Sequence, residues 1–325
     1  MTSLKLSKKY NIIVIFYLSG VVEAVTNALW PLLFWHIANY FCYFCIVYDK
    51  HSIMNIHNIA VITFSPTGAS RKVAINIAQG TGVAQIRNID LTHAPAEARL
   101  GDNSLAIISV PVYGGKPAPM AVQRMQQISG NGTPAVVVAV YGNRHYESAL
   151  EQLSDLARAK GFKVIAAATF VGEHSYSTPA TPIAVGRPDA DDCAQAQRFG
   201  AAVMQKLSSG DVTEVDAAAI EQPAQPEGAM EVFHATIAQW KSEGVKSPRT
   251  PVTDASLCVH CGCCVALCPN QAIERGNECN TDADRCIKCC ACVKGCPQKA
   301  RTMPSPFAPL ISKNFAPRKD NKVIL

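Results

Sequence analysis

Two segments of the same length decide the fold of the C-terminal part of this chain: CVHCGCCVALCP at residues 258–269 and CIKCCACVKGCP at residues 286–297. Both follow the spacing C-x-x-C-x-x-C-x-x-x-C-P, and each cysteine of the second copy lies at the same separation from its counterpart in the first. Three thiolates at two-residue intervals can hold three corners of an iron-sulfur cube, and a fourth ligand must come from elsewhere. The repeat therefore indicates two half-domains related by a local two-fold axis.

This repeat resembles a bacterial-type ferredoxin with two [4Fe-4S] clusters, and the resemblance covers every ligand position. In that class the last cysteine of each run binds the other cluster. The resemblance implies one cluster held by Cys258, Cys261, Cys264 and Cys296, and a second held by Cys286, Cys289, Cys292 and Cys268.

Two other uses of the cysteines fit less well. Neighbours this close are poor disulfide partners, and paired zinc knuckles show two separate C-x-x-C pairs instead of closed triplets. Cys263 and Cys290 adjoin ligand positions and are expected to pack as small apolar groups. No chemistry is assigned to the remaining cysteines, Cys42, Cys45, Cys193 and Cys279.

Size and composition describe an ordinary globular protein. The chain has 325 residues, 48% apolar and 17% charged, which is enough for two domains. A net charge of +5 without a run of basic residues gives no nucleic-acid footprint. Because oxidants destroy exposed clusters, the cysteine motifs favour a reducing compartment, and we expect the protein in the cytoplasm.

Residues 1–53 differ from the rest of the chain. No formal charge occurs over residues 24–48, and about 20 apolar residues are enough to span a bilayer, so a membrane anchor is one interpretation. However, Lys5, Lys8 and Lys9 precede the apolar run, and the positive-inside rule would then place the cluster domain outside the cell. A signal peptide, with residues 11–22 as its apolar part, would also export the body.

The second interpretation is that translation starts at Met54, immediately before the first predicted strand. Residues 1–53 would then be upstream sequence that the native protein lacks. The two interpretations stay open, and membrane association follows only from the first.

From residue 58 the sequence alternates apolar strands with amphipathic helices, which predicts a parallel sheet covered on both faces. The predicted strands are 59–64, 84–91, 104–110, 135–140 and 163–171, and the predicted helices are 71–79, 119–128, 146–160 and 189–207.

The loop after the first predicted strand reads Ser65-Pro-Thr67-Gly68-Ala69-Ser70. Hydroxyls around a glycine at a helix N-terminus offer a phosphate both side-chain and backbone donors. The loop has no lysine, unlike a Walker A loop, and the sequence contains no complete G-x-G-x-x-G, so neither a nucleoside triphosphate nor a nicotinamide dinucleotide is indicated.

This loop resembles the phosphate loop of flavodoxins, Ser/Thr-x-Thr-Gly-x-Ser/Thr, and two later loops, 111–115 and 141–146, match the segments that hold the flavin ring there. Together with the cluster repeat, residues 55–300 resemble the flavodoxin-ferredoxin fusion family, the EFR-type ferredoxins. The resemblance implies FMN as cofactor at the switch point of the sheet. Its implied contacts are Ser65, Thr67, Gly68, Ala69 and Ser70 for the phosphate, and Tyr113, Gly114, Gly115, Tyr141, Gly142, Asn143 and Arg144 around the ring.

Simpler roles exist for several of these residues. The Ser-Thr-Gly loop can act as an N-cap only, and Tyr113, Tyr141 and Tyr146 can be half-buried packing residues. His145 and His174 are expected to be surface or hydrogen-bonded residues, because no nucleophile or paired carboxylate accompanies them.

The expected architecture is α/β: a flavodoxin-like doubly wound parallel sheet followed by a small α+β ferredoxin domain with two cluster-binding halves. The expected segments are an apolar N-terminal extension (1–53), the FMN domain (54–208), a linker with one amphipathic helix (209–250), the 2[4Fe-4S] domain (251–300) and a basic, proline-rich tail without regular structure (301–325).

These features predict electron transfer between FMN and two [4Fe-4S] clusters, coupling one- and two-electron steps in anaerobic metabolism, with a soluble redox protein as partner. The alternative is an FMN-dependent reductase of a small quinone, flavin or nitro acceptor, supplied with ferredoxin-type electrons. No catalytic residue is identified for either.

Overall fold

The computed structural model describes residues 56–325, which lie within one compact unit. Both interpretations of residues 1–53 lie outside the described residues. Among the helices at residues 56–325, we find none with the length and apolarity needed to cross a bilayer.

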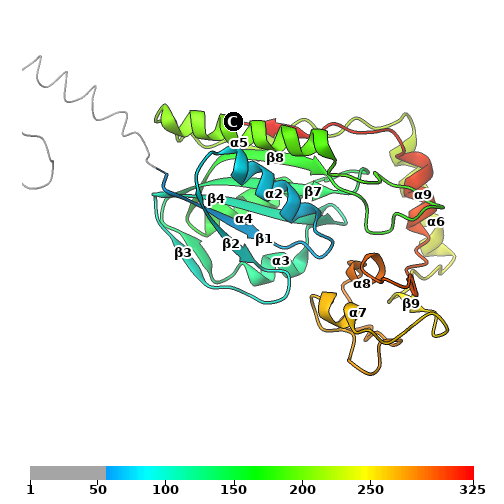
Figure 1. Ribbon diagram of the computed structural model, residues 1–325. Coiled ribbons are helices and arrows are strands. Elements are labelled where there is room, and N and C mark those ends of the chain that lie inside the picture. Colours follow the sequence, from blue (N-terminus) through cyan, green and yellow to red (C-terminus); the bar gives the residue numbers. More distant parts are fainter. Residues whose placement is uncertain (1–55) are drawn as a thin grey trace, which may run out of the picture. The chain divides into compact units, whose positions relative to one another are not determined.

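The centre of the structure is a sheet with five parallel strands, joined at one edge by a short antiparallel strand (Figure 1). In spatial order these are β2 (Gln85–Asp90), β1 (Asn58–Thr63), β4 (Ser104–Tyr113), β7 (Thr133–Tyr141), β8 (Phe162–Val171) and β11 (Lys322–Ile324). Counting the parallel strands alone, this is the order 2-1-3-4-5 of flavodoxin-like sheets. The predicted fold class is confirmed.

Helices cover both faces of the sheet, as expected for parallel strands. One face packs on α2 (Ala69–Gly80) and α5 (Ala190–Ser208), and the other on α3 (Pro119–Arg124) and α4 (Ala149–Ala159). In strand β4, successive side chains point to opposite faces of the sheet. Leu105 and Ile107 pack in the core on the side of α2 and α5, and Ala106 and Ile108 pack in the core on the side of α3 and α4.

Helices α2 and α5 cross where both carry glycine. A Cβ atom on Gly80 would collide with the carbonyl oxygen of Gln197, and one on Gly200 with that of Ile77. The close crossing fixes α2, and with it the loop that precedes this helix.

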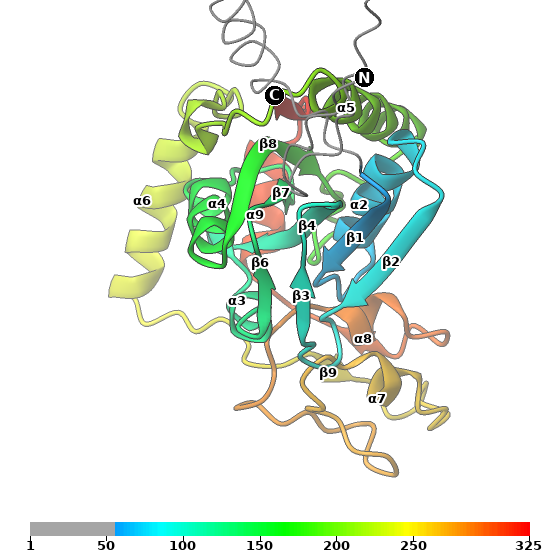
Figure 2. The same ribbon diagram turned by 90° about the vertical axis from the view of Figure 1, so that its left-hand side faces the viewer.

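The cluster repeat folds into short elements. Strands β9 (Val252–Thr253) and β10 (Arg301–Thr302) pair antiparallel, and between them lie α7 (Cys263–Leu267) and α8 (Ala291–Lys294), one in each copy of the repeat. Figure 2 shows α7, α8 and β9 gathered in one region. The linker holds a 3-10 turn, η1 (Ala217–Ala219), and the predicted amphipathic helix, α6 (Ala229–Ser242).

The prediction that prolines keep the tail irregular is wrong. Residues Phe307–Asn314 form helix α9, in which Pro309 lies in the first turn, where a missing backbone donor costs no helical hydrogen bond. Helix α9 packs against α6 through Phe233, Ile311 and Phe315. The chain then returns to the sheet as β11.

Three further short strands were not expected from the sequence: β3 (Ala98–Leu100) pairs with β6 (Ile128–Gly130), and β5 (Lys116–Pro117) pairs with β4. The helix predicted over 119–128 ends at Arg124, because residues 125–127 form a turn and Ile128 begins β6.

Candidate functional site

A cavity of about 280 Å³ opens at the carboxyl ends of the parallel strands. Its walls are the loops that follow β1, β4, β7 and β8, together with two residues of the cluster repeat. The lining comprises Ser65, Pro66, Thr67, Ala69, Ser70, Pro111, Val112, Tyr113, Gly114, Val140, Tyr141, Gly142, Gly172, Glu173, His174, Ser175, Tyr176, Ile287 and Lys288. Because β1 lies between β2 and β4, this is the point where the strand order reverses and ligands bind in open α/β sheets.

The predicted phosphate loop forms the start of α2. Gly68 is the N-cap residue at a φ of 89°, a left-handed conformation that favours glycine, and no side chain caps the helix. The hydroxyl of Ser65 accepts a hydrogen bond from the Arg71 amide at 3.0 Å, and the Ser65 amide donates to the Thr92 hydroxyl at 2.9 Å. The helix N-terminus has no acidic residue in its first turn, so its amides and partial positive charge suit an anion.

Two tyrosines line the cavity from different strands. Tyr113 lines the same cavity as Ile287 and Lys288 of the second copy of the repeat. Burial raises the pKa of Tyr113 well above its usual value, and the nearby Cys289 and Cys290 act in the same direction. Tyr141 is buried and packs edge-on against Tyr146, with ring centroids 5.4 Å apart. Within residues 56–325 the Tyr141 hydroxyl finds no hydrogen-bond partner. Tyr146 lies outside the lining and donates to the Glu221 carbonyl at 2.9 Å.

The loop after β8, residues 172–176, also lines the cavity, although the sequence analysis did not predict it. Its His174 packs directly on Gly142, where an added Cβ would collide with the imidazole ring. The Nδ1 atom of His174 accepts the Tyr176 amide at 3.0 Å. Burial lowers the pKa of His174 to about 4, and the charges of Arg144 and Lys294 add to this effect.

Four of the predicted flavin-loop residues do not line the cavity: Gly68, Gly115, Asn143 and Arg144. The amide nitrogen of Asn143 donates to the carbonyl oxygens of Phe315 and Pro317, at 2.6 and 3.0 Å. The guanidinium of Arg144 lies 4.7 Å from the ring centroid of Phe233 and 2.7 Å from a Glu147 carboxylate oxygen. Both side chains therefore hold the tail and α6 in place.

A second, smaller cavity collects four of the predicted cluster ligands. Cys258, Cys261 and Cys264 come from the first copy of the repeat and Cys296 from the second. Thiolates are the ligands of iron-sulfur clusters, so the donor set fits such a group. The structure thus brings together the crossed set that the resemblance implies, and ligation itself stays a prediction.

The other four predicted ligands lie together as well. Burial raises the pKa of Cys289 to about 12, and the neighbouring thiols Cys292, Cys268 and Cys286 contribute in the same direction. Cys268 of the first copy also packs against the apolar cluster that contains Cys292 of the second copy, so the four predicted ligands come from both copies and lie near one another.

Contacts join this second group to the flavodoxin-like part. Ile287 and Lys288, which lie between Cys286 and Cys289, form part of the wall of the larger cavity. Lys294 of α8 reaches the Glu173 carboxylate at 2.6 Å and the Ser177 carbonyl at 2.7 Å. The larger cavity and the second cysteine group are thus immediate neighbours.

Comparison with known proteins agrees with part of this description. Residues 251–274 match the family model described as a 4Fe-4S binding domain. These residues contain the first copy of the repeat. No curated protein matches the chain.

Solved structures similar to the chain include flavodoxins. A flavodoxin from the domain Archaea is 14% identical with a TM-score of 0.31, over 46% of this chain and 98% of that one. A Streptococcus pneumonia TIGR4 flavodoxin is 15% identical with a TM-score of 0.31, over 45% and 98%. The flavodiiron protein from Giardia intestinalis is 13% identical with a TM-score of 0.30, over 47% and 37%.

Proposed function

We propose that this chain is an electron-transfer protein in which FMN, bound at the carboxyl edge of the sheet, exchanges electrons with two [4Fe-4S] clusters held by the cysteine repeat. The observation that carries the proposal is the shared wall of the larger cavity: Ile287 and Lys288, flanked by two predicted cluster ligands, face the same space as Ser65 and Thr67 of the phosphate loop.

The residues around the cavity fit a phosphate-bearing aromatic ligand. The amides at the start of α2 and the hydroxyls of Ser65, Thr67 and Ser70 suit the phosphate. Tyr113 offers a ring surface, and the ammonium of Lys288 places a positive charge on the wall of the cavity. A bound flavin supplies chemistry with one or two electrons, whereas each cluster carries one.

The order of the three groups follows from these contacts. The cluster of Cys286, Cys289, Cys292 and Cys268 adjoins the cavity, and the cluster of Cys258, Cys261, Cys264 and Cys296 lies beyond it. Cys261 is exposed and Val259 is 60% exposed, so the outer cluster is accessible from solvent. We assign the outer cluster to exchange with a soluble redox partner, and residues 55–300 to the EFR-type flavodoxin-ferredoxin fusions.

The test is anaerobic purification of the native chain with flavin, iron and sulfide quantified. The proposal expects about one FMN and about eight iron atoms per chain. About four iron atoms per chain would mean that one of the two cysteine groups holds no cluster. A chain purified without flavin would contradict the proposed electron transfer between FMN and the clusters.

The alternative reductase activity predicts saturable turnover of one small quinone, flavin or nitro acceptor when reduced ferredoxin is supplied. The proposed function predicts rapid electron exchange with a protein partner and no saturation by any of these acceptors. Steady-state assays over a panel of acceptors separate the two.

A further inference from the structure

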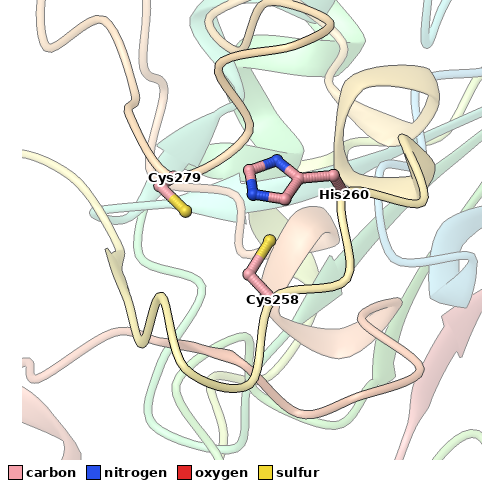
Figure 3. A group of neighbouring side chains, drawn as sticks. All are labelled: Cys258, His260 and Cys279. Atoms are coloured by element: carbon pink, nitrogen blue, oxygen red, sulfur yellow. The ribbon is translucent and has the colours of Figure 1, made fainter.

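A further cysteine, Cys279, lies near Cys258, a predicted ligand of the outer cluster, although it belongs to neither copy of the repeat. The Sγ atoms of Cys258 and Cys279 and a ring nitrogen of His260 all lie within 4.8 Å of one another. Figure 3 shows the two sulfur atoms pointing toward each other from separate segments, with the imidazole of His260 beside them.

The segment that carries Cys279 is firmly anchored on both sides of it. Arg301, which is buried, donates from Nη1 to the Glu278 carbonyl at 2.5 Å and from Nη2 to the Thr281 hydroxyl. The Glu278 side chain is also buried and accepts the Gly276 amide at 3.1 Å. The position of Cys279 is therefore a property of the fold and not of a loose connection between the repeats.

His260 is held by the same segment. Its Nδ1 atom lies 2.9 Å from a carboxylate oxygen of Glu278, and Figure 3 shows the other ring nitrogen on the side of the two sulfur atoms. A carboxylate behind a histidine is the arrangement that orients imidazoles at metal sites. Three donors of metal-ligating type thus converge at Cys258, which lines the cysteine cavity, whereas Cys279 and His260 lie behind that wall.

We propose that Cys279 is a fifth thiolate for the cluster predicted at Cys258, Cys261, Cys264 and Cys296, and that it replaces Cys258 on the same iron atom. This inference rests on the proposed function only in requiring that this cluster forms. Two bonds of about 2.3 Å span at most about 4.6 Å, so sulfur atoms within 4.8 Å reach one metal position after a small rotation of either side chain.

The proposed exchange of one thiolate ligand for another needs no oxidant or reductant. The bond between iron and the Cys258 sulfur breaks, the bond between iron and the Cys279 sulfur forms, and the proton of the Cys279 thiol passes to Cys258. No electron is transferred, so the charge of the cluster and the number of its thiolate ligands, four, are unchanged.

Ligand-deletion variants test the proposal, with iron, sulfide and EPR spectra measured on the anaerobically purified full chain. Cys258→Ala is expected to keep the full iron content, because Cys279 takes the vacant corner. Cys258→Ala/Cys279→Ala is expected to lose about one iron atom per chain and to show the EPR signal of an oxidised three-iron cluster. The inner cluster provides an internal control for folding in both variants.

Matched double variants identify the replacing ligand. Cys258→Ala/Cys263→Ala and Cys258→Ala/His260→Ala are expected to behave as Cys258→Ala does. If the single variant already loses the iron atom, or if the Cys263 or His260 double variant is the one that loses it, Cys279 is not the fifth ligand. A wild-type chain that lacks the outer cluster would instead contradict the proposed function.

Discussion

The ammonium nitrogen of Lys294 lies 2.6 Å from a carboxylate oxygen of Glu173, and this ion pair joins helix α8 of the cysteine repeat to the loop that follows β8. Both side chains are about one-third exposed. Burial alone would raise the pKa of Glu173, but the hydrogen bonds from Lys294 and from the Gly186 amide lower it below its usual value. The carboxylate is therefore charged at neutral pH, and on the acid side the pair is lost as the pH falls through this lowered pKa.

We expect Lys294→Met to slow electron transfer between the flavin and the clusters by up to about fivefold, because an ion pair of this exposure contributes about 1 kcal/mol to docking. Flavin and iron contents should not change. The rate of cluster bleaching after flavin photoreduction is the measurement.

Arg249→Met is the matched control. Arg249 forms an ion pair with Asp284, but both side chains are strongly exposed and the pair does not join the cysteine repeat to the loop after β8. An equal loss of rate in both variants would show that Lys294 has no special part in docking.

The phosphate loop gives a second prediction. Gly68→Ala places a Cβ on a residue with a φ of 89°, a conformation that costs an L-residue about 1–2 kcal/mol. The flavin-free loop can relax out of this conformation and must regain it on binding, so the variant should weaken FMN binding about 5- to 30-fold. Gly82→Ala is the control, because Gly82 has a φ of 72°, also has open space around it, and lies outside the cavity. Flavin fluorescence titrations should show weaker binding in the first variant alone, and similar losses of affinity in both would contradict the assignment of the loop.

The crossed arrangement of the cysteines predicts which cluster responds to Cys268→Ser. Cys268 belongs to the first copy of the repeat in sequence but lies near Cys286, Cys289 and Cys292 of the second. The variant should therefore perturb the inner cluster, next to the flavin cavity, and slow bleaching after flavin photoreduction. EPR spectra in which only the outer cluster changes would contradict the crossed arrangement.

His174 is expected to stay neutral between pH 5 and 8, because burial lowers its pKa to about 4 from an ordinary value near 6.5. Its proton then resides on Nε2, since Nδ1 accepts the Tyr176 amide. NMR titration of histidine-labelled protein, with His174→Gln used for assignment, checks this. A midpoint near pH 6.5 would mean that the ring is not buried in the way described.

Local patterns allowed the sheet and the loop at the start of α2 to be predicted from the sequence, and phosphate binding by this loop stays a prediction. The strands are apolar runs separated by amphipathic helices, and Ser65 to Ser70 concentrate hydroxyls and a glycine at one helix N-terminus. Both signals are contained within a few residues, so tertiary packing did not need to be known.

The features that were missed depend on contacts between distant residues. The sequence predicted that Asn143 contacts the flavin ring. In the structure its side-chain amide instead donates hydrogen bonds to the carbonyl oxygens of Phe315 and Pro317. Cys279 has no regular spacing to any other cysteine, and folding alone brings it to Cys258. Pro309 argued against a helix but falls in the first turn, where proline is tolerated.

The central claim is that a flavin at the cavity and the clusters of the cysteine repeat exchange electrons directly. The most direct measurement is photoreduction of the flavin in the anaerobic holoprotein, followed by absorbance at wavelengths where the flavin and the clusters are separately visible. The account predicts that the cluster absorbance bleaches in the same single-turnover experiment, independently of protein concentration. A reduced flavin beside clusters that stay oxidised would contradict it.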